Sequence, residues 1–146
     1  MEVEVKLDSS CTKVKVIIMA SSMTEEVHEI IKKLSGDAPK IISGSRNGKV
    51  EVLDQKDLIR IYAAGGKVFA VTDKGEYTIR LRLYELEQRL DVHQFVRISN
   101  SEIINIKKVS NFDLSFSGTI CVKLENGEVT YVSRRYVAKI KKFLGI

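Results

Sequence analysis

Beyond residue 40 the chain consists of short segments rich in β-branched and aromatic residues, with a glycine at each reversal between them. LIRIYAA, KVFAVTD and EYTIRL are three such segments, and their length and composition predict strands. The turn residues are Asn47-Gly48, Gly65-Gly66, Asp73-Lys74-Gly75 and Asn126-Gly127. Glycine and Asn-Gly pairs supply the positive φ angles that tight hairpins need. The sequence therefore predicts a mostly β, antiparallel domain, α+β overall because helices accompany the strands.

Two short helices are predicted beside this sheet. In RLYELEQRLD, Leu83, Leu86 and Leu90 recur at helical spacing. Near the C-terminal end, Ser133 is a suitable N-cap for RRYVAKIKKFL. One side of that helix is apolar and the other is basic: Tyr136, Val137, Ile140, Phe143 and Leu144 against Arg134, Arg135, Lys141 and Lys142. We expect it to dock by the apolar side and to expose the basic side.

Residues 1–45 predict a separate small β-β-α lobe. VEVKLD and KVKVII alternate apolar and charged residues, as paired strands with one wet face do. Thr24 is a plausible N-cap for a following helix, which Gly36 would end. Its apolar face, formed by Val27, Ile30, Ile31 and Leu34, would pack on the two strands. Pro39 lies in a turn, so we place the boundary near 40 to 48 and a second domain over 46–146.

Positive charge is concentrated in the second domain. The 146 residues carry a net charge of +5, with 24 Lys and Arg against 19 Asp and Glu. Residues 1–45 contain six basic and seven acidic residues, which leaves 18 against 12 for the remainder. A basic domain favours a polyanionic partner or an anionic surface, although the balance alone does not distinguish them.

Catalytic and metal-binding patterns are absent from the sequence. His28 lies on the charged side of its helix and His93 in a loop, and we interpret both as surface histidines. Cys11 and Cys121 are far apart and have no companion ligands at metal-site spacing, which indicates neither a disulfide framework nor zinc. We expect no enzyme activity, metal, cofactor or small-molecule substrate. No signal peptide or membrane-spanning run is present, so a cytoplasmic location is expected.

Several basic or amide residues stand where predicted elements meet. They are Lys67 after the double glycine, Arg97 and Asn100 in FVRISNSEIINIKKV, and Arg134 and Arg135 at a helix start. Double-stranded DNA is recognised by such groups, since Lys and Arg hold phosphates while Asn and Arg make paired contacts to base edges. Solvated surface charge with a turn amide is an equally good interpretation of these residues taken by themselves.

Three linked motifs resemble the LytTR DNA-binding domain of bacterial transcription regulators. These are FVRISNSEIINIKKV, a strand pair through ENGE, and YVSRRYVAKIKKFL. RLRLYELEQRLDVHQF matches the helix and lead-in of the family, so the resemblance covers roughly residues 46–146. It implies an elongated, mostly β fold whose loops, rather than a recognition helix, enter successive major grooves.

The resemblance also implies site residues. Asn100 would lie on a DNA-facing loop held by Ile98, Ile103 and Ile104, and Arg135 would contact a base. The turn from Gly65 to Lys67 would be a third DNA-facing loop. The candidate DNA-binding residues are Gly66, Lys67, Arg97, Ser99, Asn100, Ser101, Arg134, Arg135, Lys139 and Lys142.

This chain departs from the familiar pattern at the loop and at the N-terminal end. Many members have His and Arg at the positions of Ser99 and Asn100. The bases that this loop would contact can therefore differ from those contacted in such members. Asn105 also fits the pattern, and we interpret it as a turn or backbone cap. The first 45 residues are too few for the phosphoacceptor receiver of many members, so we do not expect regulation by aspartyl phosphorylation.

Stand-alone members with a short N-terminal lobe resemble the chain more, and in them a membrane protein encoded alongside often acts as an inhibitor. We therefore expect a homodimer on repeated DNA half-sites, with residues 1–45 serving dimerisation or inhibitor binding. The alternative is a non-catalytic β-rich module whose basic face binds an acidic protein or anionic surface. RNA binding is a third interpretation, without the aromatic strand signature of common single-strand readers.

Overall fold

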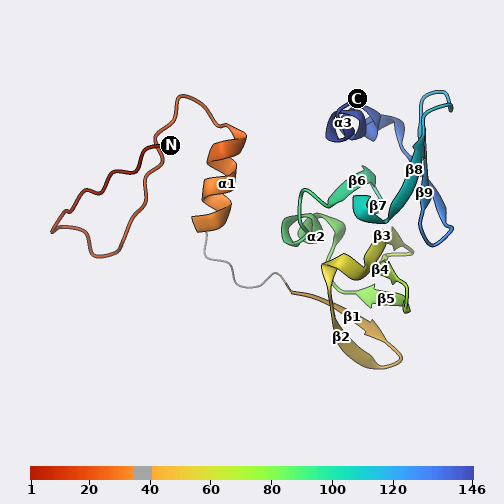
Figure 1. Cartoon of the computed structure of the whole chain (residues 1–146). Coiled ribbons are helices and arrows are strands. Elements are labelled where there is room, and N and C mark those ends of the chain that lie inside the picture. Colours follow the sequence, from red (N-terminus) through yellow and green to blue (C-terminus); the bar gives the residue numbers. More distant parts are fainter. Residues whose placement is uncertain (35–40) are drawn as a thin grey trace. The chain divides into compact units, whose positions relative to one another are not determined.

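The computed structural model describes residues 1–34 and 41–146 (Figure 1). The chain divides into two units, Met1–Pro39 and Lys40–Ile146. Each unit is described by itself. No helix among the described residues is long and apolar enough to cross a membrane.

The first unit contains the predicted helix, α1 (Glu25–Leu34). Thr24 is its N-cap, because the Thr24 Oγ1 atom accepts a hydrogen bond from the Val27 backbone N–H at 3.4 Å. Glutamates occupy the first turn and lysines the last turn, which suits the helix dipole. Gly36 and Pro39, predicted to end the helix and to form a turn, lie outside the described residues.

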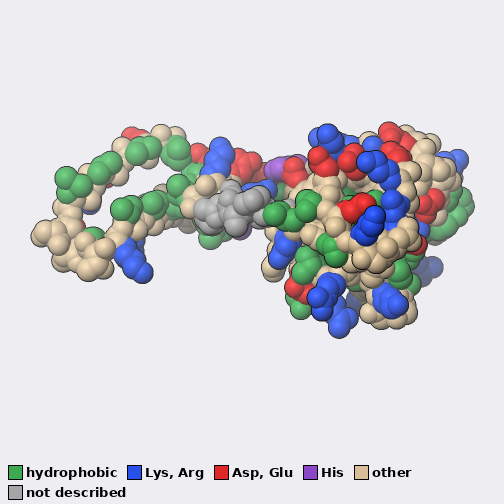
Figure 2. All heavy atoms as spheres, turned by 90° about the horizontal axis from the view of Figure 1, so that it is seen from below, with side chains coloured by type: hydrophobic (Ala, Val, Ile, Leu, Met, Phe, Trp, Pro, Cys, Tyr) green, Lys and Arg blue, Asp and Glu red, His purple; other side chains and the backbone are tan. Residues whose placement is uncertain are grey.

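The two strands predicted before α1 are not formed, so the β-β-α prediction was wrong in this respect. Residues 1–24 contain no strand, and all of them are exposed. Val5 and Val14 are 79% and 100% exposed, and green side chains line this extended segment in Figure 2. Alternation makes a strand only where a neighbour accepts its backbone hydrogen bonds and covers its apolar face. Consequently residues 1–34 provide no sheet to pack on α1, and Leu34 is 53% exposed.

The second unit contains two antiparallel sheets, in agreement with the predicted mostly β fold. The larger has seven strands in the order β2-β1-β5-β4-β3-β7-β6, and the smaller has three in the order β10-β9-β8. The strands of the larger sheet are β1 (Ile42–Arg46), β2 (Lys49–Leu53), β3 (Leu58–Ala64), β4 (Lys67–Thr72), β5 (Gly75–Ile79), β6 (Phe95–Ser99) and β7 (Glu102–Asn105). Those of the smaller are β8 (Val109–Asp113), β9 (Ile120–Leu124) and β10 (Val129–Val132).

Two predicted α-helices and two short 3-10 helices complete this unit. They are α2 (Leu83–Arg89), α3 (Arg134–Leu144), η1 (Gln55–Asp57) and η2 (Ile106–Lys108). Leu83, Leu86 and Leu90 are buried in one apolar core with residues of the larger sheet. Ile140 of α3 is buried in a second core, which joins the smaller sheet to Ile59, Val96, Ile98 and Ile104. The predicted apolar side of α2 is thus confirmed, and that of α3 is confirmed except at Phe143, which is 38% exposed.

The predicted hairpin turns are confirmed as well. Asn47 and Gly48 have φ angles of 53° and 75°, and Gly65 and Gly66 have 57° and 76°. Positive φ at both central residues is the backbone of the type I′ turn, whose twist matches that of the flanking strands. The β1–β2 and β3–β4 connections are therefore two-residue hairpins whose register the turn fixes.

Arg60 on β3 ties the two sheets together. Its guanidinium forms ion pairs with Glu102 on β7 at 3.1 Å and with Glu128, just before β10, at 2.7 Å. Thr130 Oγ1 donates a hydrogen bond to the second oxygen of Glu102 at 2.6 Å. Burial works against the charged guanidinium, but the two carboxylates outweigh it, and the pKa of Arg60 is raised above its ordinary value.

Candidate nucleic-acid interface

Two turns of the larger sheet lie side by side at one end of it. The turn with Gly65 and Gly66 joins β3 to β4, and residues 99–101, the 99–101 loop below, join β6 to β7. β3 pairs with β7, and the Ala63 N–H donates a 2.8 Å hydrogen bond to the Ser101 carbonyl oxygen beyond the ladder. The backbone thus extends the pairing of these strands up to both turns.

The start of α3 joins the same end of the molecule. The Ser133 N–H donates to the Ile98 carbonyl oxygen at 2.9 Å. The Tyr136 hydroxyl donates to Asn100 Oδ1 at 3.1 Å. Arg135 lies between these two anchored residues, on an exposed position. Three segments far apart in sequence therefore meet here: 65–67, 99–101 and 133–136.

The 99–101 loop stands on buried branched residues, as predicted. Ile98, Ile103 and Ile104 are at most 1% exposed. Between them, Ser99 Oγ accepts a hydrogen bond from the Ser101 N–H at 3.2 Å, while Asn100 is exposed. The polar triplet therefore forms a tight turn in which Asn100 is exposed while the isoleucines on either side of it are buried.

Arg97 differs from the other candidate residues because its side chain is directed inward. The guanidinium donates from Nε to the Ser99 carbonyl oxygen at 2.7 Å and from Nη2 to the Asn100 carbonyl oxygen at 2.6 Å. Nη1 forms an ion pair with Glu87 of α2. These partners occupy three of the five N–H donors, and the side chain is 15% exposed, so this residue mainly contacts the loop and α2.

The remaining cations are exposed. Lys67 starts β4 beside the double glycine, and Lys139 lies 5.9 Å from the centre of the Tyr136 ring. A first side-chain carbon at Gly118 would be 3.3 Å from Arg134 Nε, so that arginine lies against the β8–β9 loop. Lys142 is exposed further along α3. Three of these cations, Arg134, Lys139 and Lys142, are thus on α3, and Lys139 lines a shallow hollow together with Glu87 and Arg97.

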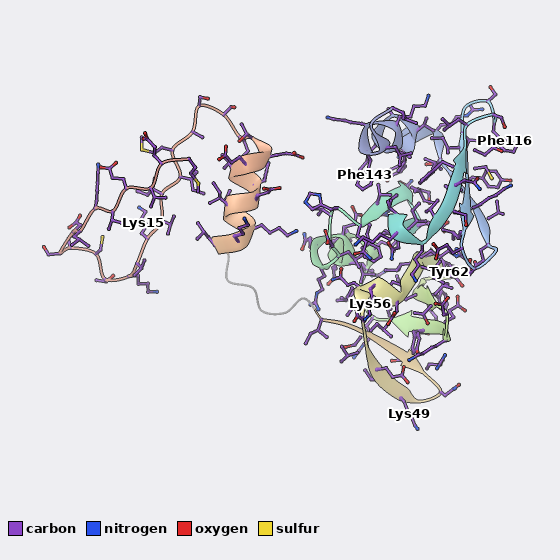
Figure 3. The ribbon with its side chains drawn as sticks, viewed as in Figure 1. Lys15, Lys49, Lys56, Tyr62, Phe116 and Phe143 are labelled. Atoms are coloured by element: carbon purple, nitrogen blue, oxygen red, sulfur yellow. The ribbon has the colours of Figure 1, made fainter. Side chains whose placement is uncertain are left out.

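The opposite end of the larger sheet carries other turns. Arg46 Nη1 donates to the Lys74 carbonyl oxygen, which brings together the turns around 47–48 and 73–75. Lys49 lies beside the tip of the β1–β2 hairpin (Figure 3). In the view of Figure 2, Lys and Arg side chains are interspersed with acidic and apolar ones. Positive charge is thus also present at this end, among side chains of other kinds.

Sequence reasoning had no role for Tyr136, which the structure connects to Asn100. Only the apolar spacing of its helix was informative, and that spacing does not reveal the partner of a hydroxyl.

Asn105 caps η2, as predicted. Its Oδ1 atom accepts a hydrogen bond from the Lys107 N–H at 3.0 Å. Fully buried, it also donates from Nδ2 to the Leu58 carbonyl oxygen at 2.7 Å.

The residues first considered for catalysis were His28, His93, Cys11 and Cys121, two in each unit. His28 and His93 are exposed, as predicted, and Cys121 is buried as a small core residue while Cys11 is exposed. Across residues 1–34 and 41–146, no three His, Cys, Asp or Glu side chains cluster in a way that could hold a metal ion. The chemistry of the site is hydrogen bonding and charge.

Comparisons with known proteins agree with this fold. The profile of the LytTr DNA-binding domain matches residues 48–145. An uncharacterised HTH-type transcriptional regulator of Staphylococcus aureus strain NCTC 8325 / PS 47 is 31% identical over 147 residues, covering 100% of this chain and 99% of the relative. A regulator of the same description from strain MSSA476 has the same identity and coverage.

A solved structure has the same fold. It is the LytTr DNA-binding domain of a protein described as a putative methyl-accepting/DNA response regulator from Bacillus cereus. It superposes with a TM-score of 0.70 at 21% identity, over 73% of this chain and 97% of that one. The names of the Staphylococcus aureus relatives include the term HTH-type, which refers to two successive helices. In the part of the chain described here, no two α-helices follow one another without an intervening strand.

The match over residues 48–145 makes the second unit a DNA-binding domain of the LytTr class. The chain belongs to the LytTR family.

Proposed function

We propose that the protein is a transcriptional regulator that binds double-stranded DNA in a sequence-specific manner and reads the major groove through loops. The observation that carries this proposal is the meeting of residues 65–67, 99–101 and 133–136 at one end of the second unit, fixed by the Ala63–Ser101 and Tyr136–Asn100 hydrogen bonds. The names of the Staphylococcus aureus relatives, which call them transcriptional regulators, support it.

The proposed roles follow from the chemistry of each side chain. With its Oδ1 engaged by Tyr136, Asn100 retains Nδ2 as a donor toward a base edge. Arg135 is exposed and can donate two parallel hydrogen bonds to a guanine edge. Lys67, Arg134, Lys139 and Lys142 would neutralise phosphates, while Gly66, Ser99 and Ser101 would bring backbone and hydroxyl groups close to the duplex.

Selection of bound duplexes from a random pool, followed by titration of the selected and a scrambled duplex, tests this function. We expect selection to recover a defined sequence and the protein to prefer it by at least about a thousandfold. A protein that binds selected and scrambled duplexes alike, or that binds an acidic protein surface or anionic vesicles but no duplex, would contradict it and favour a general interaction module.

We further propose that the protein acts as a homodimer on repeated half-sites, and that residues 1–45 mediate self-association or bind a membrane-protein inhibitor. Support comes from α1, on whose apolar side Leu34 is 53% exposed. Apolar side chains on a short helix are stable in water chiefly when a partner covers them. The expected dimer would then join two DNA-binding units through their N-terminal parts.

Replacement of Leu34 by serine tests the first role, with Lys33→Ser as the matched control on the same helix. Light scattering after gel filtration should show a lower dimer fraction for Leu34→Ser and no change for Lys33→Ser. If both variants keep the mass of the unmodified protein, self-association does not use α1. Loss of binding to a detergent-solubilised candidate inhibitor in Leu34→Ser alone would assign the second role.

A further inference from the structure

Arg97 connects α2 to the backbone of the 99–101 loop. Its Nε and Nη2 atoms donate to the carbonyl oxygens of Ser99 and Asn100, at 2.7 and 2.6 Å. Both acceptors are backbone atoms on either side of the Asn100 Cα. Two donors of one planar guanidinium on consecutive carbonyls fix the orientation of the two peptide units that flank the Asn100 Cα. They therefore fix the direction in which the Asn100 side chain points from the loop.

Glu87 forms an ion pair with that guanidinium from the side of α2. It is on α2, ten residues before Arg97, and its Oε1 atom pairs with Arg97 Nη1. The Arg97 side chain is 15% exposed and that of Glu87 is 39% exposed. Helix α2 is itself anchored, with Leu83, Leu86 and the adjoining Leu90 buried in the first core. The carboxylate is thus presented from a rigid support and not from another loop.

We propose that Glu87 is a positioning residue for DNA recognition, acting through Arg97 to fix the conformation in which Asn100 meets a base. The inference rests on the proposed function. A carboxylate that faced a duplex would repel it. Glu87 would instead favour sequence reading, because it acts through Arg97. The inference also reassigns Arg97 from a DNA contact to the link between α2 and the loop.

Geometry separates this role from a plain phosphate contact. An arginine that neutralises a phosphate directs most of its donors to solvent, whereas Arg97 is only 15% exposed and gives three of its five N–H donors to protein acceptors, one from each nitrogen. On the other side of the loop, Tyr136 holds the Asn100 side chain through Oδ1. The Glu87–Arg97 pair holds the main chain and Tyr136 holds the amide, so the two supports act on different atoms of one residue.

The first measurement uses the free, full-length protein. Glu87→Gln keeps the shape of the side chain and removes its charge, and Glu125→Gln, an exposed acid in the β9–β10 turn, is the matched control. Backbone amide resonances of Ser99, Asn100 and Ser101 should shift in Glu87→Gln and remain in place in Glu125→Gln. Unchanged resonances of these three residues in Glu87→Gln would overturn the proposal.

The second measurement compares base preference in a double-mutant cycle. On the selected duplex, Glu87→Gln should lower the preference at the base pair read by Asn100 about fivefold, the factor expected for one lost hydrogen bond. On an Asn100→Ala background the same change should have no further effect on that preference. An equal effect on both backgrounds would mean that Glu87 acts on base preference independently of Asn100, and would refute the positioning role.

These outcomes are separable from failure of the proposed function. A wild-type protein that prefers no duplex sequence refutes sequence-specific binding, and the amide resonances of the free protein still decide whether Glu87 fixes the loop. Arg97→Lys provides a second variant that keeps the charge but cannot hold both carbonyls. We expect it to shift the same three resonances; if it leaves them in place, the link through Arg97 is wrong.

Discussion

The Tyr136 hydroxyl donates a hydrogen bond to Asn100 Oδ1 at 3.1 Å, across 36 residues of sequence. This contact joins the first turn of α3 to the 99–101 loop, while the Ser133 to Ile98 backbone hydrogen bond fixes the same helix start a few residues earlier. Because α3 follows β10 and the loop follows β6, the contact also joins segments from the two sheets.

Removal of this hydroxyl is expected to weaken sequence reading. Tyr136→Phe keeps the ring and its packing but leaves the Asn100 amide without its partner, which should cost about 1 kcal/mol in binding to the selected duplex. Titration of that duplex measures the loss, and thermal unfolding of the free protein checks that the fold is kept. Unchanged affinity and unchanged base preference would show that the hydroxyl does not orient Asn100.

Asn100→Ala and Arg135→Ala are expected to cost about 1 to 3 kcal/mol each in specific binding, and each should relax the preference at a single base pair. A panel of duplexes with one base pair changed at a time measures this. Equal losses on specific and scrambled duplexes would instead assign both residues to phosphates.

Removal of the α3 lysines should have a different signature. Lys142→Ala and Lys139→Ala are expected to weaken binding to all duplexes alike and to lower the log-log salt slope by about 0.9 for each phosphate that the variant no longer neutralises. Lys49→Ala is the matched control, because Lys49 lies at the β1–β2 end of the sheet (Figure 3). A slope that falls equally for Lys49→Ala would contradict the proposed face.

The ion pairs of Arg60 lead to a prediction about the stability of the fold and not about binding. Arg60→Met leaves Glu102, which is 9% exposed, without its ion-pair partner. We expect a loss of about 2 kcal/mol in the free energy of unfolding, below the range for a fully buried pair because the arginine is partly exposed. Urea denaturation measures it. Lys56→Met, which removes an exposed pair with Asp54, should change stability by less than about 1 kcal/mol.

The local features of the fold were predictable because each is encoded in a few neighbouring residues. Asn47-Gly48 and Gly65-Gly66 define their hairpins, and the spacing of Leu83, Leu86 and Leu90 defines one face of α2. The strands predicted within residues 1–24 are absent because a local pattern does not supply a pairing partner. Alternation describes one strand, but a strand also needs a partner, and these exposed residues pair with no strand among those described.

The site was predictable in its parts but not in its connections. The sequence marks Asn100 as a polar loop residue above Ile98 and Ile104, and the structure agrees. It does not show that the Arg97 guanidinium turns back to Glu87, because an arginine next to a loop can equally face solvent. Division of the strands between two sheets was likewise beyond local patterns, since it depends on pairings such as Arg60 with Ile104.

The most direct test of the convergent face is to map the backbone amides that respond when the selected duplex is added to the ¹⁵N-labelled protein. We predict simultaneous changes at 65–67, 99–101 and 133–136, and none at the 47–48 and 73–75 turns of the opposite end. Changes confined to one of the three segments, or shared with the opposite end, would contradict a single duplex-binding face.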